Sequence, residues 1–414
     1  RNCLVGSEMC IRDSYWTVSE QNELYVPFTE FVIYNRLLII SLGTITLLSI
    51  YKVFSFSQNA FTFSFSKKDS KRAIKNNFGG ITKINLPKIT FDFSFKNDLK
   101  KLWQLSNVDF LFIVKSWPFI IIVIISLLIN LVGLSELGNV FGTPTYPRTW
   151  KMLQAGATFF LFINICTFLY AGNLLHRSRL SNINQLIDTN PTPNWILLGS
   201  KFLAIIKMQL VLISLVMISG ILFQIYNGYY DFEIGHYLYE LIILSLISYI
   251  IWAFLSFLIQ TLITDRNVGL FVVILLFIGI PLLGAAGVEQ SIFKYGSGPG
   301  YAYSDMNGYG SSFNRFFIYK IYWLSLGLVF YIITYLFYYR GLNSSFKERI
   351  AIAKSRFKGK YPKFLGLFLL IFLSTGGYLY YETNILNKRT SSKESELQTV
   401  EWEKKYKKYE NYDC

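Results

Sequence analysis

The sequence predicts an all-α membrane protein, a polytopic helical bundle with about eight transmembrane helices. Three observations indicate this class. The 414 residues are 52% hydrophobic and only 16% charged, whereas an average soluble domain has about 25% charged residues. The apolar residues form long runs, and a run of about 20 such residues crosses the hydrocarbon core of a bilayer. Aromatic residues, 18% of the chain, crowd the ends of these runs, as in an interfacial belt.

The composition also excludes other classes of protein. So apolar a chain would collapse rather than remain disordered, and four cysteines in 414 residues are too few for a disulfide scaffold. A large soluble core is the remaining alternative. The helices of soluble proteins seldom run this far without charges, so we expect the runs to span a bilayer.

Eight apolar runs are the predicted spans. Several contain Gly or Ser, which suits close packing of helices in lipid. The sixth contains Pro281, which would break a soluble helix but is tolerated in a membrane bundle as a kink. The runs cover residues 37–55, 118–136, 153–173, 202–225, 238–263, 268–287, 319–338 and 364–381.

Basic residues are concentrated in two connectors between the runs. Residues 51–117 hold twelve Lys or Arg and four Asp, and residues 340–363 hold eight Lys or Arg and one Glu. By the positive-inside rule both connectors face the cytoplasm. Eight spans then alternate consistently in a multi-pass membrane protein. Residues 174–201 and the turn at Asp265 also fall inside, whereas both chain ends and the segments 137–152, 226–237 and 288–318 fall outside.

The uneven spacing of the runs divides the chain into segments. Residues 1–14 resemble a translated sequencing adapter and are excluded from the fold. Residues 118–338 read as one six-span unit. Around it we expect the last span of an upstream half (15–55), a basic cytoplasmic linker (56–117), a second basic linker (339–363), the eighth span (364–381) and an extracytoplasmic tail leading to a missing domain (382–414).

The second half of the first linker predicts an amphipathic helix. Its apolar and basic residues suit a helix that lies along the inner membrane surface, although a partly ordered linker fits equally. The residues of this predicted helix are Leu99, Leu102, Trp103 and Leu105, with Lys96, Lys100 and Lys101.

Nucleic acid is another candidate partner for the basic connectors. Anionic head groups of membrane lipids are the more favourable partner, and we expect no nucleic-acid partner.

Catalytic constellations are scarce, and we expect no enzyme, no metal and no cofactor in this chain. HExxH, the Walker loop GxxxxGK[ST] and GxSxG do not occur in the sequence. The two histidines, His176 and His236, fall on opposite sides of the membrane by the predicted topology. The ionisable residues Lys207, Glu240 and Glu136 lie near the ends of spans, where a side chain can snorkel to the interface.

Two connectors are candidate functional sites. In residues 174–201, Leu180, Ile183, Leu186 and Ile187 follow helical spacing before two prolines, which suits either docking of another protein or an ordinary surface helix. The outer loop 295–310 holds five glycines in sixteen residues, which indicates unusual backbone angles. We interpret it as a folded outer cap or docking surface, with candidate residues Gly296, Gly298, Pro299, Tyr303, Ser304, Asp305, Asn307 and Gly308.

Eight short segments carry a pattern shared with a known family. They are YWTVSEQNELYVPFTE (15–30), KSWPF (115–119), GTPTYPRTW (142–150), LYAGNLLHRSR (169–179), DTNPTPNW (188–195), YGSGPGYAYSDMNGYG (295–310), YETNILNKR (381–389) and EKKYKKYE (403–410). Together they resemble a bacterial family in which an ABC type-2 permease is fused to an aminopeptidase N-like zinc metallopeptidase. The resemblance covers roughly residues 15–414.

The resemblance implies two permease halves of six spans each, followed by an extracytoplasmic peptidase domain. Residues 118–338 would then be the second half, an ABC type-2 permease-like six-helix unit, and the peptidase would follow beyond this chain. In such permeases the cytoplasmic segment between the second and third spans docks on the ATPase. That implies ATPase-coupling roles for Arg177, Arg179, Asn184, Asp188 and Pro191. Members of this family often carry an acidic residue just before the basic cluster. This chain differs, because it has the sequence LLHR at that place, without an acidic residue.

The expected function is therefore that of a transmembrane permease component of an ABC type-2 system. It would move an unknown substrate across the inner membrane, with an ABC ATP-binding subunit, a second permease half and membrane lipids as partners. Two alternatives stay open. The spans could anchor the missing peptidase without transporting anything, or they could form an ion-coupled secondary transporter without an ATPase.

Overall fold

The computed structural model describes residues 30–53, 94–136, 139–140, 143–157, 159–301, 303–310, 312–341, 345–387 and 392–406. The chain divides into two compact units, residues 1–89 and 90–414. The predicted adapter-like segment, linker residues 56–93 and the last part of the tail lie outside the described residues.

The first unit contributes a single described helix, α3 (Glu30–Val53). Its polar side chains do not interrupt the helix, because the hydroxyls of Ser41, Thr44 and Thr46 donate to carbonyl oxygens one turn earlier. This back-bonding satisfies polar groups on an otherwise apolar helix. The helix begins seven residues before the predicted run at 37–55.

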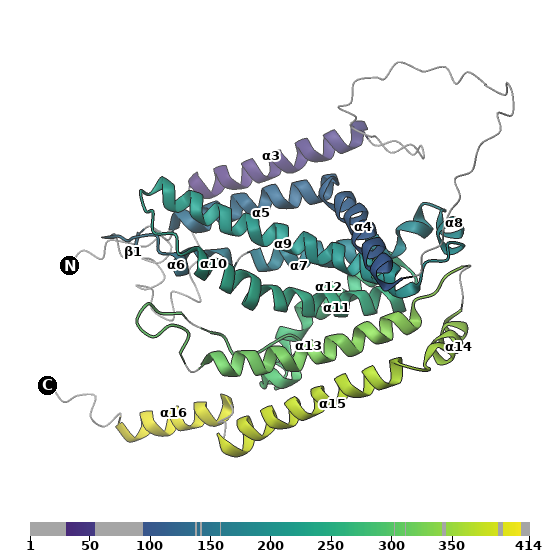
Figure 1. The fold of residues 1–414 in the computed structure, drawn as a ribbon. Coiled ribbons are helices and arrows are strands. Elements are labelled where there is room, and N and C mark those ends of the chain that lie inside the picture. Colours follow the sequence, from purple (N-terminus) through teal and green to yellow (C-terminus); the bar gives the residue numbers. More distant parts are fainter. Residues whose placement is uncertain are drawn as a thin grey trace. The chain divides into compact units, whose positions relative to one another are not determined.

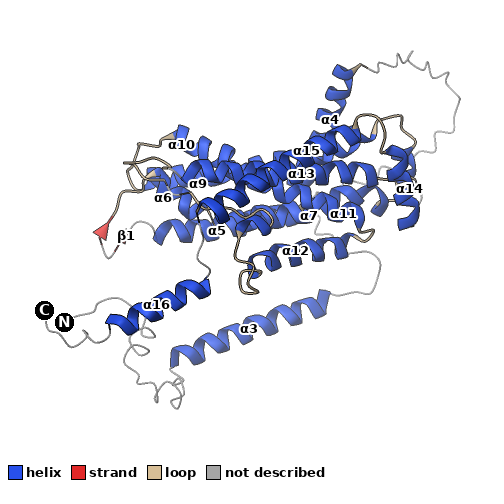
Figure 2. Ribbon diagram, turned by 90° about the horizontal axis from the view of Figure 1, so that it is seen from below, coloured by secondary structure: helices blue, strands red, loops and turns tan. Residues whose placement is uncertain are grey.

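The second unit is built almost entirely of helices, as the colours of Figure 2 show. The strands of the described residues are an antiparallel pair of two residues each, β1 (Asn139–Val140) and β2 (Thr143–Pro144). The helices are α4 (Phe95–Val114), α5 (Trp117–Glu136), α6 (Thr149–Gly156), α7 (Phe159–Leu180), α8 (Asn184–Asp188), α9 (Asn194–Tyr226), α10 (Ile234–Leu238), the π-helix η1 (Tyr239–Ser245), α11 (Leu246–Leu262), α12 (Arg266–Leu282), the 3-10 helix η2 (Ser291–Phe293), α13 (Ser312–Phe337), α14 (Phe346–Arg356), α15 (Tyr361–Tyr380), the π-helix η3 (Tyr381–Leu386) and α16 (Ser392–Tyr406).

Among the described residues, six helical stretches are long and apolar enough to cross a membrane: 117–135, 159–180, 194–226, 234–262, 313–337 and 361–386. They match six of the eight predicted runs. The all-helical class is therefore confirmed, and the six helices support a membrane-embedded protein. The first and sixth runs form α3 and α12. The apolar part of each helix has fewer residues than the other six stretches and is too short to count as a candidate span. The count of eight spans therefore stays a prediction.

Pro281 lies close to the end of its helix. It is the second-last residue of α12, which ends at Leu282 instead of running on to residue 287. A proline removes one helical hydrogen bond and clashes with the preceding turn. The expected kink at this residue stays a prediction.

The core of the second unit lies among α7, α9 and α11, and polar side chains tie these helices together. The Nε2 atom of Gln209, on α9, donates to the Thr167 hydroxyl of α7 at 3.0 Å and to the Tyr249 carbonyl oxygen of α11 at 3.3 Å. The amide of Asn130 on α5 donates to Ser219 on α9 at 2.8 Å. Buried polar contacts of this kind hold helices together where lipid gives no hydrophobic driving force.

Small residues allow α13 to approach its two neighbours. A Cβ on Gly327 would lie 2.5 Å from the Phe254 ring of α11, and one on Gly376 of α15 would lie 2.9 Å from the Tyr322 ring. Tyr322 also stacks on Phe372 of α15, with ring centroids 4.5 Å apart. α15 rests on this side of α13 and is otherwise little buried.

The connections gather at two ends of the second unit. α8 and α14 lie at one end, and β1, α6 and α10 lie at the other (Figure 1). We call the first the basic end, defined by Arg177, Arg179, Arg340, Arg349 and Arg356. We call the second the loop end, defined by the loop of residues 288–310.

Candidate functional site

The connector between α7 and α9 forms the centre of the basic end. α7 continues to Leu180, so the single helix expected over residues 180–187 is divided by a turn. Asn182 has a φ of +54°, a left-handed conformation that Asn tolerates better than most residues. The chain reverses there and forms the five-residue helix α8. Pro193 then caps the start of α9 in an extended conformation.

Arg177 points to α4 and is paired within the bundle. Its Nη1 atom lies 3.3 Å from Oδ1 of Asp109, and its guanidinium lies 4.0 Å from the centroid of the Phe112 ring. Nζ of Lys201, on α9, lies 4.0 Å from Oδ2 of the same Asp109. Asp109 therefore links α4 to both α7 and α9.

Arg179 and Asp188 contact the segment that follows α13. Nη2 of Arg179 donates to the carbonyl oxygen of Tyr339 at 3.1 Å, and its guanidinium lies 3.7 Å from the centroid of that residue's ring. The Asp188 carboxylate accepts a hydrogen bond of 2.8 Å from the backbone amide of Gly341. Arg340 donates to the carbonyl oxygens of Asn190 and Thr192. Side chains at the connector thus bind the backbone after α13, and a side chain after α13 binds the backbone of the connector.

The structure brings three of the five predicted coupling residues into these contacts. The other two, Asn184 and Pro191, stay outside the network: Asn184 opens α8 and Pro191 lies in the turn beyond it. The apolar side chains of this connector are exposed, with Leu186 at 77% and Leu180 at 60%. The connector therefore has a firmly held polar side and an open apolar side.

Two arginines of α14 close the basic end, and the sequence reasoning missed them. Arg349, only 3% exposed, donates two hydrogen bonds of 2.8 Å to the carbonyl oxygens of Thr261 and Leu262. Arg356 donates to the carbonyl oxygen of Tyr338, beyond the end of α13. The last carbonyls of a helix have no partner within it, and basic side chains are well suited to them. The residues 339–363 were expected only as a basic linker.

The amphipathic helix predicted for the second half of the first linker is present as α4, and it is longer than expected.

Lys207 of α9 was expected to snorkel to the interface. Instead its Nζ atom donates to the Ser106 hydroxyl and to the Asn107 side-chain oxygen, each at 2.6 Å, and lies 3.5 Å from the centroid of the Trp103 ring. The lysine therefore binds α9 to α4.

At the loop end, the first part of the Gly-Tyr loop packs on the helices. The Tyr295 hydroxyl donates to the carbonyl oxygen of Ile251 at 2.7 Å, and the Trp323 indole donates to that of Ser297 at 2.6 Å. Gly296 has a φ of +72°, and a Cβ there would lie 3.2 Å from the Trp252 indole nitrogen. A side chain at Gly298 would meet the Tyr319 side chain at 3.2 Å.

The second part of the loop folds into a tight turn over α10. Ser304 and Gly308 form an isolated antiparallel bridge, and Gly308 has a φ of +58°. Asp305 at the tip pairs with Arg148, which precedes α6. The carboxylate raises the pKa of that guanidinium through a hydrogen bond and its charge. The backbone of Asn307 continues the turn, since its amide donates to the carbonyl oxygen of Ser304 at 3.2 Å.

Glu240 lies under this turn and is held by tyrosines of the loop. The hydroxyls of Tyr301 and Tyr309 donate to its two carboxylate oxygens at 3.4 and 3.3 Å. Nε2 of His236 lies 3.4 Å from the same carboxylate, and the ring of Tyr303 covers the imidazole at 4.1 Å between centroids. Glu240 was expected to need only snorkelling, yet it is the residue on which this half of the loop converges.

Glu382 occupies a similar position on the other side of α13. Each π-helix of the described chain, η1 and η3, opens with Tyr-Glu. The Glu382 carboxylate accepts a 2.9 Å hydrogen bond from Nε of Arg315. These two side chains line a pocket with Pro299, Tyr319, Ser291, Thr383 and Asn387.

Lys320 is a buried cation that the sequence reasoning overlooked. It lies on α13, is 7% exposed, and its Nζ atom lies 4.9 Å from the centroid of the Phe316 ring. The signal was present, because a lysine inside an apolar run is uncommon. The predicted run began at residue 319, which made Lys320 look like a flanking residue.

The two histidines lie at different ends of the unit, His176 against the carbonyl oxygen of Gln260 at 3.0 Å and His236 under the loop. In the described part of the chain, no group of three or more His, Cys, Asp or Glu side chains is placed to hold a metal ion. Comparison with known proteins gives no match to a family model, to a curated protein or to a solved structure.

Proposed function

We propose that this chain is the transmembrane permease component of an ABC type-2 transport system, which moves an unknown substrate across the bacterial inner membrane with a separate ATPase. In this proposal the basic end faces the cytoplasm and the loop end faces outside, in line with the positive-inside rule. The other permease half and a peptidase domain would lie in parts of the protein outside this chain.

One observation carries the proposal: the connector with α8 is exposed on its apolar side, and its polar side is bound to the segment that follows α13, while α7 beside it is bound to α4 through Arg177. A subunit that binds Leu186 and its apolar neighbours could pull on α8. The force would pass to α7 directly, to α4 through Arg177 and Asp109, and to the end of α13 through Asp188 and Gly341. Movement of rigid helices against one another is an established way to switch between two states.

The test is co-purification of the chain with its ATP-binding subunit from a native membrane. Leu186→Asp places a charge on the exposed side without touching the polar contacts, and we expect it to remove the subunit. Leu397→Asp on α16, where Leu397 is also exposed at 63%, is the matched control and should retain it. An intact complex with Leu186→Asp would contradict the coupling role. Arg179→Glu is a poorer test, because Arg179 holds Tyr339 within the chain.

A second candidate is an ion-coupled secondary transporter, which the arrangement around Glu240 favours. A carboxylate, an imidazole and two phenols meet there, and protonatable side chains within membrane segments commonly form ion or proton relays. Transport that follows a proton or sodium gradient and continues after ATP depletion would support this candidate. Loss of transport on ATP depletion alone would support the permease. A chain that transports nothing in either assay would be an anchor.

A further inference from the structure

α14 has two unlike faces, and one of them is exposed. The helix starts with a capping box in which Ser345 and Glu348 bond each other's backbone amides. Arg349, Ala353 and Arg356 are three and four residues apart, so they share the face that is turned into the bundle. The opposite face is available to another molecule.

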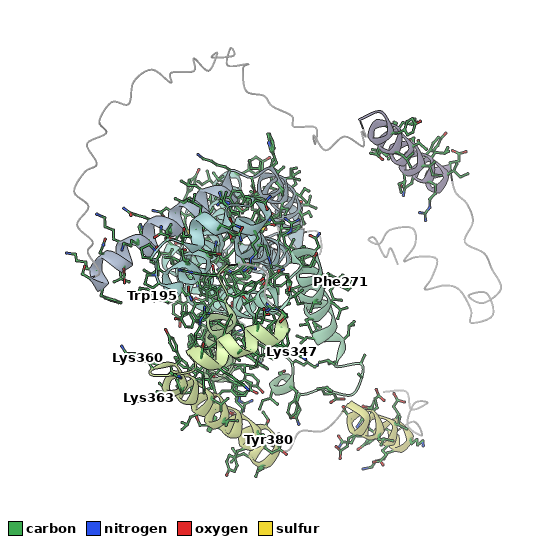
Figure 3. All side chains as sticks on the ribbon, turned by 90° about the vertical axis from the view of Figure 1, so that its right-hand side faces the viewer. Trp195, Phe271, Lys347, Lys360, Lys363 and Tyr380 are labelled. Atoms are coloured by element: carbon green, nitrogen blue, oxygen red, sulfur yellow. The ribbon has the colours of Figure 1, made fainter. Side chains whose placement is uncertain are left out.

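That opposite face begins a cluster of exposed lysines. Lys347 and Lys354 are seven residues apart and therefore lie on the same side of α14. Lys358, Lys360 and Lys363 continue the cluster to the first turn of α15. Figure 3, seen from the basic end, labels Lys347, Lys360 and Lys363 on these two helices. We call these five residues the lysine patch.

The lysine patch has an uncompensated positive charge. The only acidic residue between positions 345 and 363 is Glu348, and its carboxylate is used in the capping box. None of the five lysines forms an ion pair within the parts of the chain that the structure describes. The patch would therefore attract an anionic partner.

The position of the patch indicates which anionic partner meets it. α13 ends at Phe337 and α15 begins at Tyr361, and both are candidate membrane spans. α14 is thus tied at both ends to helices that emerge from a bilayer, so it lies at the level of the head groups. Exposed aromatic rings lie beside the lysines: Phe357 and Phe364 are 44% and 49% exposed. Lysines mixed with aromatic residues are typical of helices on an anionic lipid surface.

We infer that the lysine patch is a binding surface for the head groups of anionic phospholipids. The ammonium groups contact lipid phosphates, and the phenyl rings enter the boundary between head groups and acyl chains. The other face of the same helix holds the ends of α11 and α13 through Arg349 and Arg356. Anionic lipid bound on one side of α14 therefore stabilises the ends of two core helices on the other. The inference does not depend on an ATPase or on transport.

The test uses the full chain in detergent micelles, titrated with short-chain dioctanoyl phosphatidylglycerol at low salt. The variant Lys347→Gln/Lys354→Gln removes two charges from the patch. The matched control Lys404→Gln/Lys405→Gln removes two exposed charges from α16. Each lysine near an anionic surface changes the affinity by about five-fold, so the patch variant should bind roughly 25-fold more weakly. The control should bind as the unaltered chain does, and 0.5 M salt should weaken both.

Several results would overturn the inference. Equal affinity of the two double variants would do so, and so would equally tight binding of dioctanoyl phosphatidylcholine, which carries no net charge. Glycerol 3-phosphate binding as tightly as the lipid would show a free-phosphate site instead. A DNA oligonucleotide that bound more tightly than the lipid, and lost affinity in the patch variant, would reassign the surface to nucleic acid. Lys347→Arg/Lys354→Arg keeps the charge and should keep the affinity, so its failure would also overturn the inference.

Discussion

Replacing Arg349 by Met tests whether α14 holds the basic end together. The guanidinium donates two hydrogen bonds of 2.8 Å to the last carbonyls of α11 and is almost fully buried. A hydrogen bond that involves a charged group contributes about 1.5–3 kcal/mol, and the cost of burying the guanidinium offsets part of the sum. We expect Arg349→Met to lower the free energy of unfolding by about 3 kcal/mol.

Thermal unfolding in detergent measures this loss, followed by the reactivity of a thiol probe with buried Cys166 in a chain whose Cys3, Cys10 and Cys414 are replaced by Ser. For a chain of this size we expect Tm to fall by roughly 3–4 °C. Arg315→Met is the matched control, because the Arg315 side chain is 57% exposed in its pair with Glu382 and such pairs contribute about 0–1 kcal/mol. The reasoning is refuted if the two variants unfold within about 1 °C of each other.

Three further predictions concern other contacts and use the same unfolding assay. Lys207→Met removes two hydrogen bonds of 2.6 Å to α4 and should cost about 2 kcal/mol; an unchanged Tm would show that α4 is held without it. Gly327→Ala places a methyl group 2.5 Å from the Phe254 ring and should cost about 1–3 kcal/mol, whereas Gly366→Ala enters open space and should cost nothing. Asp265→Ala should lower Tm at pH 7, because two amides of the first turn of α12 hold the pKa of the Asp265 carboxyl below its usual value. A carboxyl whose pKa is lowered by folding stabilises the folded state at pH values above its pKa in the unfolded chain. This stabilisation is lost as the pH falls through the pKa of the folded state, so the variant and the unaltered chain should have the same Tm at about pH 2. A difference that persists in acid would contradict this assignment.

The helices could be predicted from the sequence because hydrophobic length and helical period are local properties. All eight predicted runs form apolar helices, and α4 appears where Leu99, Leu102 and Trp103 were expected on or near one helix face. Helix ends were less accurate. α9 begins at Asn194, eight residues before the predicted run, because polar and basic residues such as Lys201 find partners inside the bundle instead of water.

The contacts at the candidate sites could be predicted only in part, because they join residues that are far apart in the sequence. The pattern of Arg177 and Arg179 drew attention to the right connector, but nothing local to it indicates that Asp109 or Tyr339 is the partner. Glu240 looked like an interfacial carboxylate because its tyrosine partners come from a loop more than sixty residues away. Arg349 looked like one more positive charge in a basic linker.

The two π-helices give the loop end a geometric property that an unbroken α-helix would lack. A turn of this kind holds one residue more than an α-turn, and such insertions occur often at functional sites. Deleting that residue would rotate the preceding side chains by about 100° relative to the rest of the helix. Glu240 would then face away from Tyr301 and Tyr309, and Glu382 away from Arg315. The contact of Glu240 with the loop of residues 288–310, and that of Glu382 with α13, thus each depend on a single additional residue in a helix.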